Sequence, residues 1–167
     1  ETMLIRGNEG VYWKDMRLQN AGYTWDYFAP QILEEDFIDY EEGQLIKDGP
    51  GYQALIIYQD SLPISTARKL LQLAKKGLPV VFVNGVTETI RPRGITKHHD
   101  YAAKMTPYND KADEELQAIV REMKGLSNVR EVNEQSKTYE ALKELGVSPR
   151  TEYEKPNKNV LTYVKED

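Results

Sequence analysis

The chain has 167 residues, 40% of them hydrophobic and 29% charged, which is enough for one domain with its own core. Its net charge of −5 argues against nucleic acid or an anionic membrane as the main partner. It has no cysteines, which excludes disulfides, thiolate metal sites and cysteine nucleophiles; no apolar run approaches the ~20 residues that span a bilayer, and no signal peptide is visible.

The first fifty residues contain several short segments with strand or helix character. Thr2–Ile5 is predicted to be a first or edge strand, and Val11–Ala21 a helix that Gly22 ends. The aromatic run Tyr23–Phe28 strongly favours a strand, which Pro30 ends. Further predictions are a helical turn or two within Ile32–Tyr40, a brief strand at Gln44–Ile46 and a turn at Asp48–Gly51.

The strongest pattern is a strand, a helix and a second strand between residues 52 and 84. Ala54–Tyr58 and Pro79–Val83 are apolar without alternation, which predicts strands buried on both faces. Gly77 is placed to end the helix between them, so the two strands should be parallel neighbours. One stripe of that helix is apolar: Ile64, Ala67, Leu70, Leu71 and Ala74.

After Val83 the pattern is less regular. Asn84–Pro107 has glycines, prolines and charges with little periodicity, and is predicted to be a long loop. Two further helices are expected, at Asp110–Lys124 and Glu134–Leu145. Their expected caps are Asn109 and Asn133 at the starts, with Gly125 and Gly146 at the ends. The remaining predicted strands are Val129–Val132, Arg150–Tyr153 and Asn159–Val164.

Strands and helices that alternate at this spacing predict an α/β fold, a three-layer sandwich with a mostly parallel central sheet. Residues 1–167 are expected to form a single domain. Its ends, Glu1 and a charged tail, suggest a module of a longer protein, although simple processing or tag removal explains them equally well. In such folds ligands bind at the carboxyl ends of the strands, so a site should be sought there.

Three polar residues lie in or directly after predicted strands: Asp26, Asp60 and Asn84. Two carboxylates and an amide could bind sugar hydroxyls, and Trp25 or Tyr27 could stack on a sugar face. A structural explanation competes with this one. Asp60 or Ser61 could cap the following helix, and Asn84-Gly85 could form a simple turn.

The sequence gives weaker support for a metal site, a nucleophile or a phosphate-binding loop. His98 and His99 are adjacent in an extended segment, so they should point in opposite directions, and no further metal ligands can be named. Ser61 and Ser65 have no assignable base. No phosphate-binding loop is present, since Gly7–Gly10 does not match the known glycine patterns. We therefore expect no metal and no cofactor. The basic residues Arg91, Arg93, Lys97 and Lys104 are expected to be solvated.

Three segments together resemble a known module. They are Asn20–Leu33, the run from Gly51 to Gly77 with its Leu62-Pro63 step, and Leu145–Pro149. This order resembles an internal α/β module of large bacterial glycoside hydrolases, above all the α-L-rhamnosidases of glycoside hydrolase family 106. The module is similar to class I glutamine amidotransferase-like domains, which also occur in family 42 β-galactosidases.

The resemblance implies a flavodoxin-like or amidotransferase-like sandwich without amidotransferase chemistry, since the required cysteine is missing. It implies a non-catalytic accessory module whose partners are the other domains of its parent chain, with carbohydrate nearby. It favours Asp26 and its aromatic neighbours for any contact with sugar. The alternatives are a small stand-alone hydrolase or transferase, with a site at Asp60, Asn84 and the long loop, and an oligomerisation module.

Overall fold

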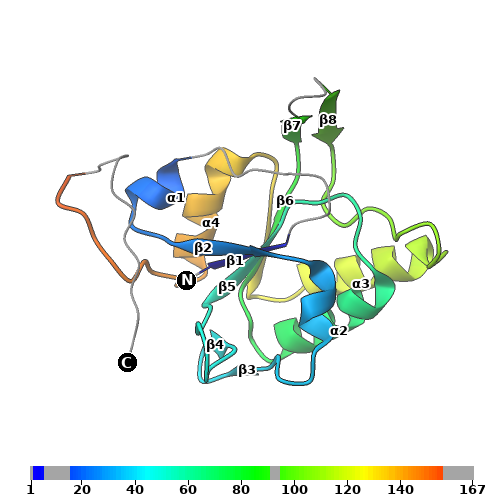
Figure 1. Ribbon diagram of the computed structural model, residues 1–167, viewed down its shortest axis with the longest axis horizontal. Helices are drawn as coiled ribbons and strands as arrows, with labels where there is room; N and C mark the ends of the chain where they lie inside the picture. Colours follow the sequence, from blue (N-terminus) through cyan, green and yellow to red (C-terminus); the bar gives the residue numbers. More distant parts are fainter. Residues whose placement is uncertain (1, 6–15, 91–94, 156–167) are drawn as a thin grey trace.

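The structure is a computed structural model that describes residues 2–5, 16–90 and 95–155 (Figure 1). Among these residues, five strands form one sheet in which every neighbouring pair is parallel. In spatial order the strands are β2 (Trp25–Phe28), β1 (Thr2–Ile5), β5 (Ala54–Ile57), β6 (Val80–Val83) and β9 (Val129–Val132).

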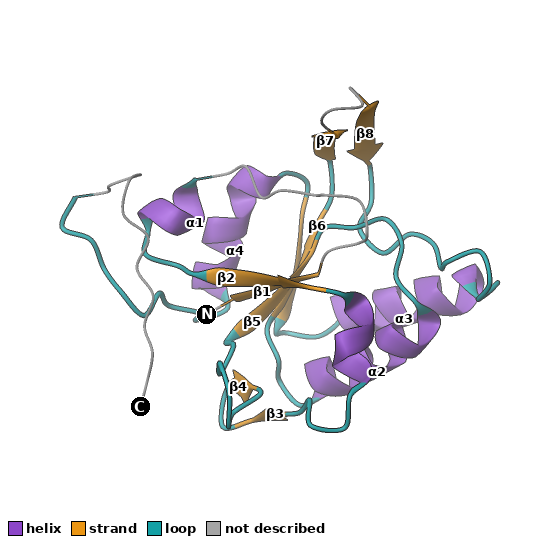
Figure 2. Cartoon of the chain, in the orientation of Figure 1, coloured by secondary structure: helices purple, strands orange, loops and turns teal. Residues whose placement is uncertain are grey.

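Helices cover both faces of this sheet, which gives three layers (Figure 2). On one face lie α2 (Ile64–Lys75) and α3 (Asp113–Lys124), and on the other lie α1 (Arg17–Asn20) and α4 (Thr138–Glu144). None of the helices in the described ranges is long and apolar enough to cross a lipid bilayer. The smaller elements are two 3₁₀ turns, η1 (Pro30–Glu34) and η2 (Gln135–Lys137), and a short antiparallel pair, β3 (Tyr40–Glu41) with β4 (Gln44–Leu45).

The central strands β5 and β6 are buried along their whole length. Successive side chains of a strand point to opposite faces. Leu55 and Ile57 therefore join the apolar cluster beneath α2 and α3, whereas Ala54 and Ile56 join the one beneath α1 and α4. Two-sided burial explains why this stretch of sequence is apolar without alternation. Each large aliphatic side chain that is buried here stabilises the fold by about 1.5–3 kcal/mol.

The predicted strand–helix–strand unit is confirmed. β5 pairs directly with β6 in parallel, with Ile56 opposite Val81. Gly77 follows the helix with φ of +108°, a conformation that favours glycine. The prediction for Thr2–Ile5 is confirmed as a first strand but not as an edge strand, because β1 lies between β2 and β5.

The prediction of one long loop from Asn84 to Pro107 is wrong in part. β7 (Val86–Ile90) and β8 (Ile95–His99) form an antiparallel hairpin that projects beyond the sheet and helices (Figure 1). Both strands are rich in β-branched residues, which favour extended backbone, although the segment lacks the apolar alternation of a half-buried strand. His98 and His99 lie in β8, so they are in an extended segment as expected, but in a strand and not in the predicted loop.

Several predicted helix caps are also wrong. The N-cap of α3 is Ala112 rather than Asn109, and α4 starts at Thr138 after η2, with Lys137 in place of Asn133 at its N-cap. Neither N-cap residue makes a side-chain capping hydrogen bond. Arg150–Tyr153 is irregular rather than a strand. The predictions for residues 7–10 and 159–164 lie outside the described residues.

The start of α2 is capped by a residue that is distant in the sequence. Its N-cap residue is Pro63, so neither Asp60 nor Ser61 is at the predicted N-cap position. Instead, the Ile64 N–H donates to Asp110 Oδ2 at 2.8 Å. A carboxylate at this end of a helix satisfies a free N–H and complements the helix dipole. Asp110 therefore ties the segment before α3 to the start of α2.

Replacing this cap should destabilise the fold measurably. We expect Asp110→Ala to lower the free energy of unfolding by about 1 kcal/mol, as loss of an N-cap usually does. The control is Asn109→Ala at the exposed neighbouring position, which should change it by less than about 0.5 kcal/mol. Urea denaturation measures both. Equal losses in the two variants would contradict the assigned cap.

Candidate functional site

The carboxyl edge of the sheet holds two of the predicted site residues after neighbouring strands. Asp60 follows β5 and Asn84 follows β6, and these strands are parallel neighbours. The backbone carbonyl of Asp60 accepts hydrogen bonds from the N–H groups of Lys104 and Met105, at 2.7 and 3.0 Å. The segment after β8 is therefore fastened to the end of β5, and it covers this edge of the sheet.

Asn84 is a buried structural link. Its side chain is 8% exposed, and both ends of the amide are used. Oδ1 accepts from the Ala102 N–H at 2.7 Å, and Nδ2 donates to Glu131 Oε1 at 2.7 Å. One amide thus joins β6, β9 and the segment that follows the hairpin. Satisfying a buried polar group in this way avoids a desolvation cost of about 1–3 kcal/mol.

The chain bends at Gly85, next to the position where a turn was predicted, and Gly85 has φ of +66°. A Cβ at Gly85 would lie 2.3 Å from the Asn133 carbonyl oxygen, so the backbone approach itself excludes a side chain. The chain enters the β7–β8 hairpin through this bend. Asn84 and Gly85 together fix one root of the hairpin to the sheet.

A hollow of about 590 Å³ lies beside this edge, between the end of β9 and α4. The residues that determine its polarity are Asn84, Tyr101, Arg130, Glu131, Lys137 and Glu140. Arg130 pairs with Glu144 at 3.2 Å, and Lys124 pairs with Glu131. Several charged groups here are therefore matched within the chain.

The electrostatics of Glu131 reflect these contacts. Burial by itself would raise the pKa of this carboxyl. Hydrogen bonds from Lys124 and Asn84, together with the charge of Lys124, outweigh that effect and hold the pKa of Glu131 below its ordinary value. The group is therefore ionised at neutral pH, which suits a structural acceptor better than a general acid.

Asp26 lies apart from Asp60 and Asn84. It is on β2, an edge strand, whereas Asn84 follows β6, with β1 and β5 between them. Asp26 Oδ2 accepts a hydrogen bond from Tyr52 Oη at 2.8 Å. Alternation along β2 places Trp25 and Tyr27 on the other face, where both are half-buried against the cluster beneath α1 and α4. The carboxylate and the two rings therefore do not form one surface.

Within the described ranges, no group of three or more His, Asp or Glu side chains could hold a metal ion. The residues that sequence reasoning missed are Glu131 and Ala102, the two partners of Asn84. They are 47 and 18 residues away from it, so no local pattern indicates them. The one feature of the sequence that indicates this site is Asn84 itself, a polar residue directly after a buried strand.

The sheet and its two helical layers define an α/β protein with a parallel sheet. No protein-family model matches the sequence, and no curated protein matches it. A solved structure of a rhamnosidase from Novosphingobium sp. PP1Y is similar, with a TM-score of 0.56 and 17% sequence identity. The match covers 89% of this chain and 14% of that chain. At this identity the likeness establishes a shared fold, and this chain corresponds to a small part of the rhamnosidase.

The link made by Asn84 predicts an unusual pH response in Asn84→Asp. This variant keeps the acceptor for Ala102 but places a carboxylate against Glu131, and should cost about 2–3 kcal/mol at neutral pH. In the unchanged protein, the lowered pKa of Glu131 gives a stabilisation that is lost as the pH falls through that pKa. In the variant, acidification protonates one carboxyl of the pair, so the difference from the unchanged protein should shrink towards pH ~4.

The matched control is Asn133→Asp, the same change at an exposed residue that lines the same hollow. It should cost less than about 0.5 kcal/mol at either pH. Urea unfolding at the two pH values gives all the differences. A pH-independent loss in Asn84→Asp would show that the contact with Glu131 is not what matters.

Proposed function

We propose that this chain is a non-catalytic accessory α/β module of a multidomain glycoside hydrolase, with a parent of rhamnosidase or galactosidase type. The observation that carries the proposal is the fold shared with part of a rhamnosidase, over 89% of this chain. The other domains of the parent are then its partners, and carbohydrate is close to it.

The strand order supports the finer fold assignment. In order of appearance along the chain, the strands of the sheet are arranged second, first, third, fourth and fifth. This is the order of flavodoxin-like folds, in which the sheet is covered by helices on both faces. We therefore assign the domain to a flavodoxin-like or class I glutamine amidotransferase-like sandwich.

The chemistry of the carboxyl edge supports an accessory role. Both ends of the Asn84 amide bond to protein groups, and Glu131 is held in its ionised form. A catalytic pair would instead need groups directed at a substrate, with pKa values displaced towards their task. Among the residues whose burial is described, three aromatic side chains are exposed and suit contacts with a neighbouring domain: Phe37, Tyr101 and Tyr108.

The proposal predicts that the 167-residue chain unfolds cooperatively and hydrolyses neither nitrophenyl α-L-rhamnoside nor nitrophenyl β-D-galactoside. Release of nitrophenol, followed by absorbance, measures the second point. Asp26→Ala and Asp60→Asn serve as matched variants, because they remove the two carboxylates that sequence analysis singled out.

Turnover by the unchanged chain that is lost in either variant would contradict the proposal. Loss in Asp60→Asn would favour the alternative of a small stand-alone hydrolase with its site at the sheet edge. Loss in Asp26→Ala would place the chemistry on β2.

A further inference from the structure

Two segments far apart in the sequence are joined on the face covered by α1 and α4. Tyr23 lies in the aromatic segment before β2, and Val147 follows α4. The Tyr23 hydroxyl donates to the Val147 carbonyl at 2.7 Å, in a buried hydrogen bond. Thr151 Oγ1 donates to the Gly22 carbonyl at 3.1 Å. Both segments were singled out in the sequence, and neither is used at the carboxyl edge of the sheet.

The approach of these two backbones is very close. Gly22 has φ of +90°, and a Cβ there would lie 1.8 Å from the Thr151 carbonyl oxygen. Only glycine fits such a contact. The segment after α4 is therefore held against the end of α1 by backbone packing as well as by two hydrogen bonds, which makes its position well defined.

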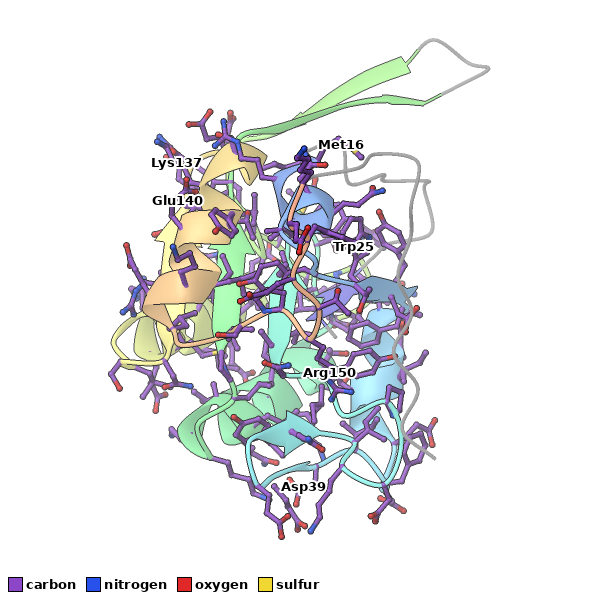
Figure 3. The ribbon with its side chains drawn as sticks, turned by 90° about the vertical axis from the view of Figure 1, so that its left-hand side faces the viewer. Met16, Trp25, Asp39, Lys137, Glu140 and Arg150 are labelled. Carbon is purple, nitrogen blue, oxygen red and sulfur yellow. The ribbon has the colours of Figure 1, made fainter. Side chains whose placement is uncertain are left out.

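These contacts enclose one side of a second hollow, of about 410 Å³. Figure 3 faces this side of the molecule, with α1 and α4 next to each other and the segment that follows α4 running past them. The volume of this hollow is within the range of about 300–1,000 Å³ that is usual for small-ligand sites. The lining residues that matter chemically are Asn20, Tyr23, Tyr139, Lys143, Glu152 and Tyr153.

The aromatic part of the lining is ordered. The rings of Tyr23 and Tyr139 meet edge to face, with centroids 6.2 Å apart and an interplanar angle of 82°. The Lys143 ammonium lies 5.4 Å from the centroid of the Tyr139 ring. Burial, with a smaller effect from Tyr139, raises the pKa of Tyr23 to about 12, so its phenol is neutral over the physiological range.

The polar part of the lining contains both donors and acceptors. Lys143 donates, Glu152 accepts, and the Asn20 amide does both. The positive and negative side chains offset each other, so the hollow favours neither an anion nor a cation. A ligand that suits it has apolar C–H surfaces for the tyrosine rings and hydroxyl groups that both donate and accept. A neutral sugar ring has this combination.

We propose that the hollow between α1, α4 and residues 147–153 binds one neutral pyranose unit. The proposal rests on the proposed function for the class of ligand, and the site itself rests on the geometry above. Lys143 and Glu152 are its hydrogen-bonding residues, and Tyr139 and Tyr153, which are both partly exposed, form its apolar wall.

The test is a titration of the ¹⁵N-labelled 167-residue chain with methyl α-L-rhamnopyranoside and methyl β-D-galactopyranoside, followed by NMR. Each probe is taken to about 20 mM, well above the Kd of about 1 mM typical of a weak single-unit site. We expect saturable shifts of the amides around Tyr139, Lys143 and residues 147–153. Lys143→Met and Glu152→Gln should each weaken binding about fivefold or more, since the first removes a charged donor and the second replaces a charged acceptor with a neutral one.

The matched controls are exposed residues of the same types outside this hollow: Lys137→Met at the N-cap of α4 and Glu154→Gln two residues beyond Glu152. Both should leave the affinity unchanged. No saturable shift with either probe, or equal weakening by test and control variants, would overturn the site. Shifts confined to residues around Asp60 and Asn84 would overturn the site while leaving the accessory function intact. The accessory function fails separately, by turnover of the nitrophenyl glycosides.

Discussion

The architecture depends on one constraint: β5 and β6 are buried on both faces, and every residue from Ala54 to Ile57 and from Val80 to Val83 is enclosed. A sheet whose central strands are apolar on both faces must be covered by other elements on each face. The layer of α2 and α3 covers one face, while α1 and α4, supplemented by Tyr23 and Val147, cover the other. Polar chemistry is consequently confined to the edge strands, the strand ends and the helical surfaces.

The part of the fold that the sequence predicts correctly is the part set by local patterns. Two apolar runs, an amphipathic helix and Gly77 at its end were sufficient for β5, α2 and β6, because burial and helical periodicity act over a few residues. The start of α2 could not be predicted in the same way, because the side chain that accepts from the Ile64 N–H belongs to Asp110, 46 residues away. The β7–β8 hairpin was missed because it carries β-branched residues without the apolar alternation of a packed strand.

The candidate site could also be predicted only in part. The positions of Asp60 and Asn84 at one edge follow from strand ends in a parallel sheet, but what Asn84 does there depends on Ala102 and Glu131, which no spacing rule identifies. Strand alternation separates Asp26 from Trp25 and Tyr27, and this separation could have been derived from the sequence. The hollow formed by Tyr23 and Val147 joins residues 124 positions apart, and only the folded chain brings them together.

A scaffold of this kind is suited to holding surfaces in place. Its buried centre fixes the carboxyl edge through Asn84 and the opposite helical layer through Tyr23. Native-state hydrogen exchange measures whether β5 and β6 are the most stable part of the fold. Because both strands are enclosed on two faces, we expect their amides to be the slowest to exchange and to open only with global unfolding. Amides in β5 and β6 that exchange as readily as those of the exposed segment around Tyr108 would contradict it.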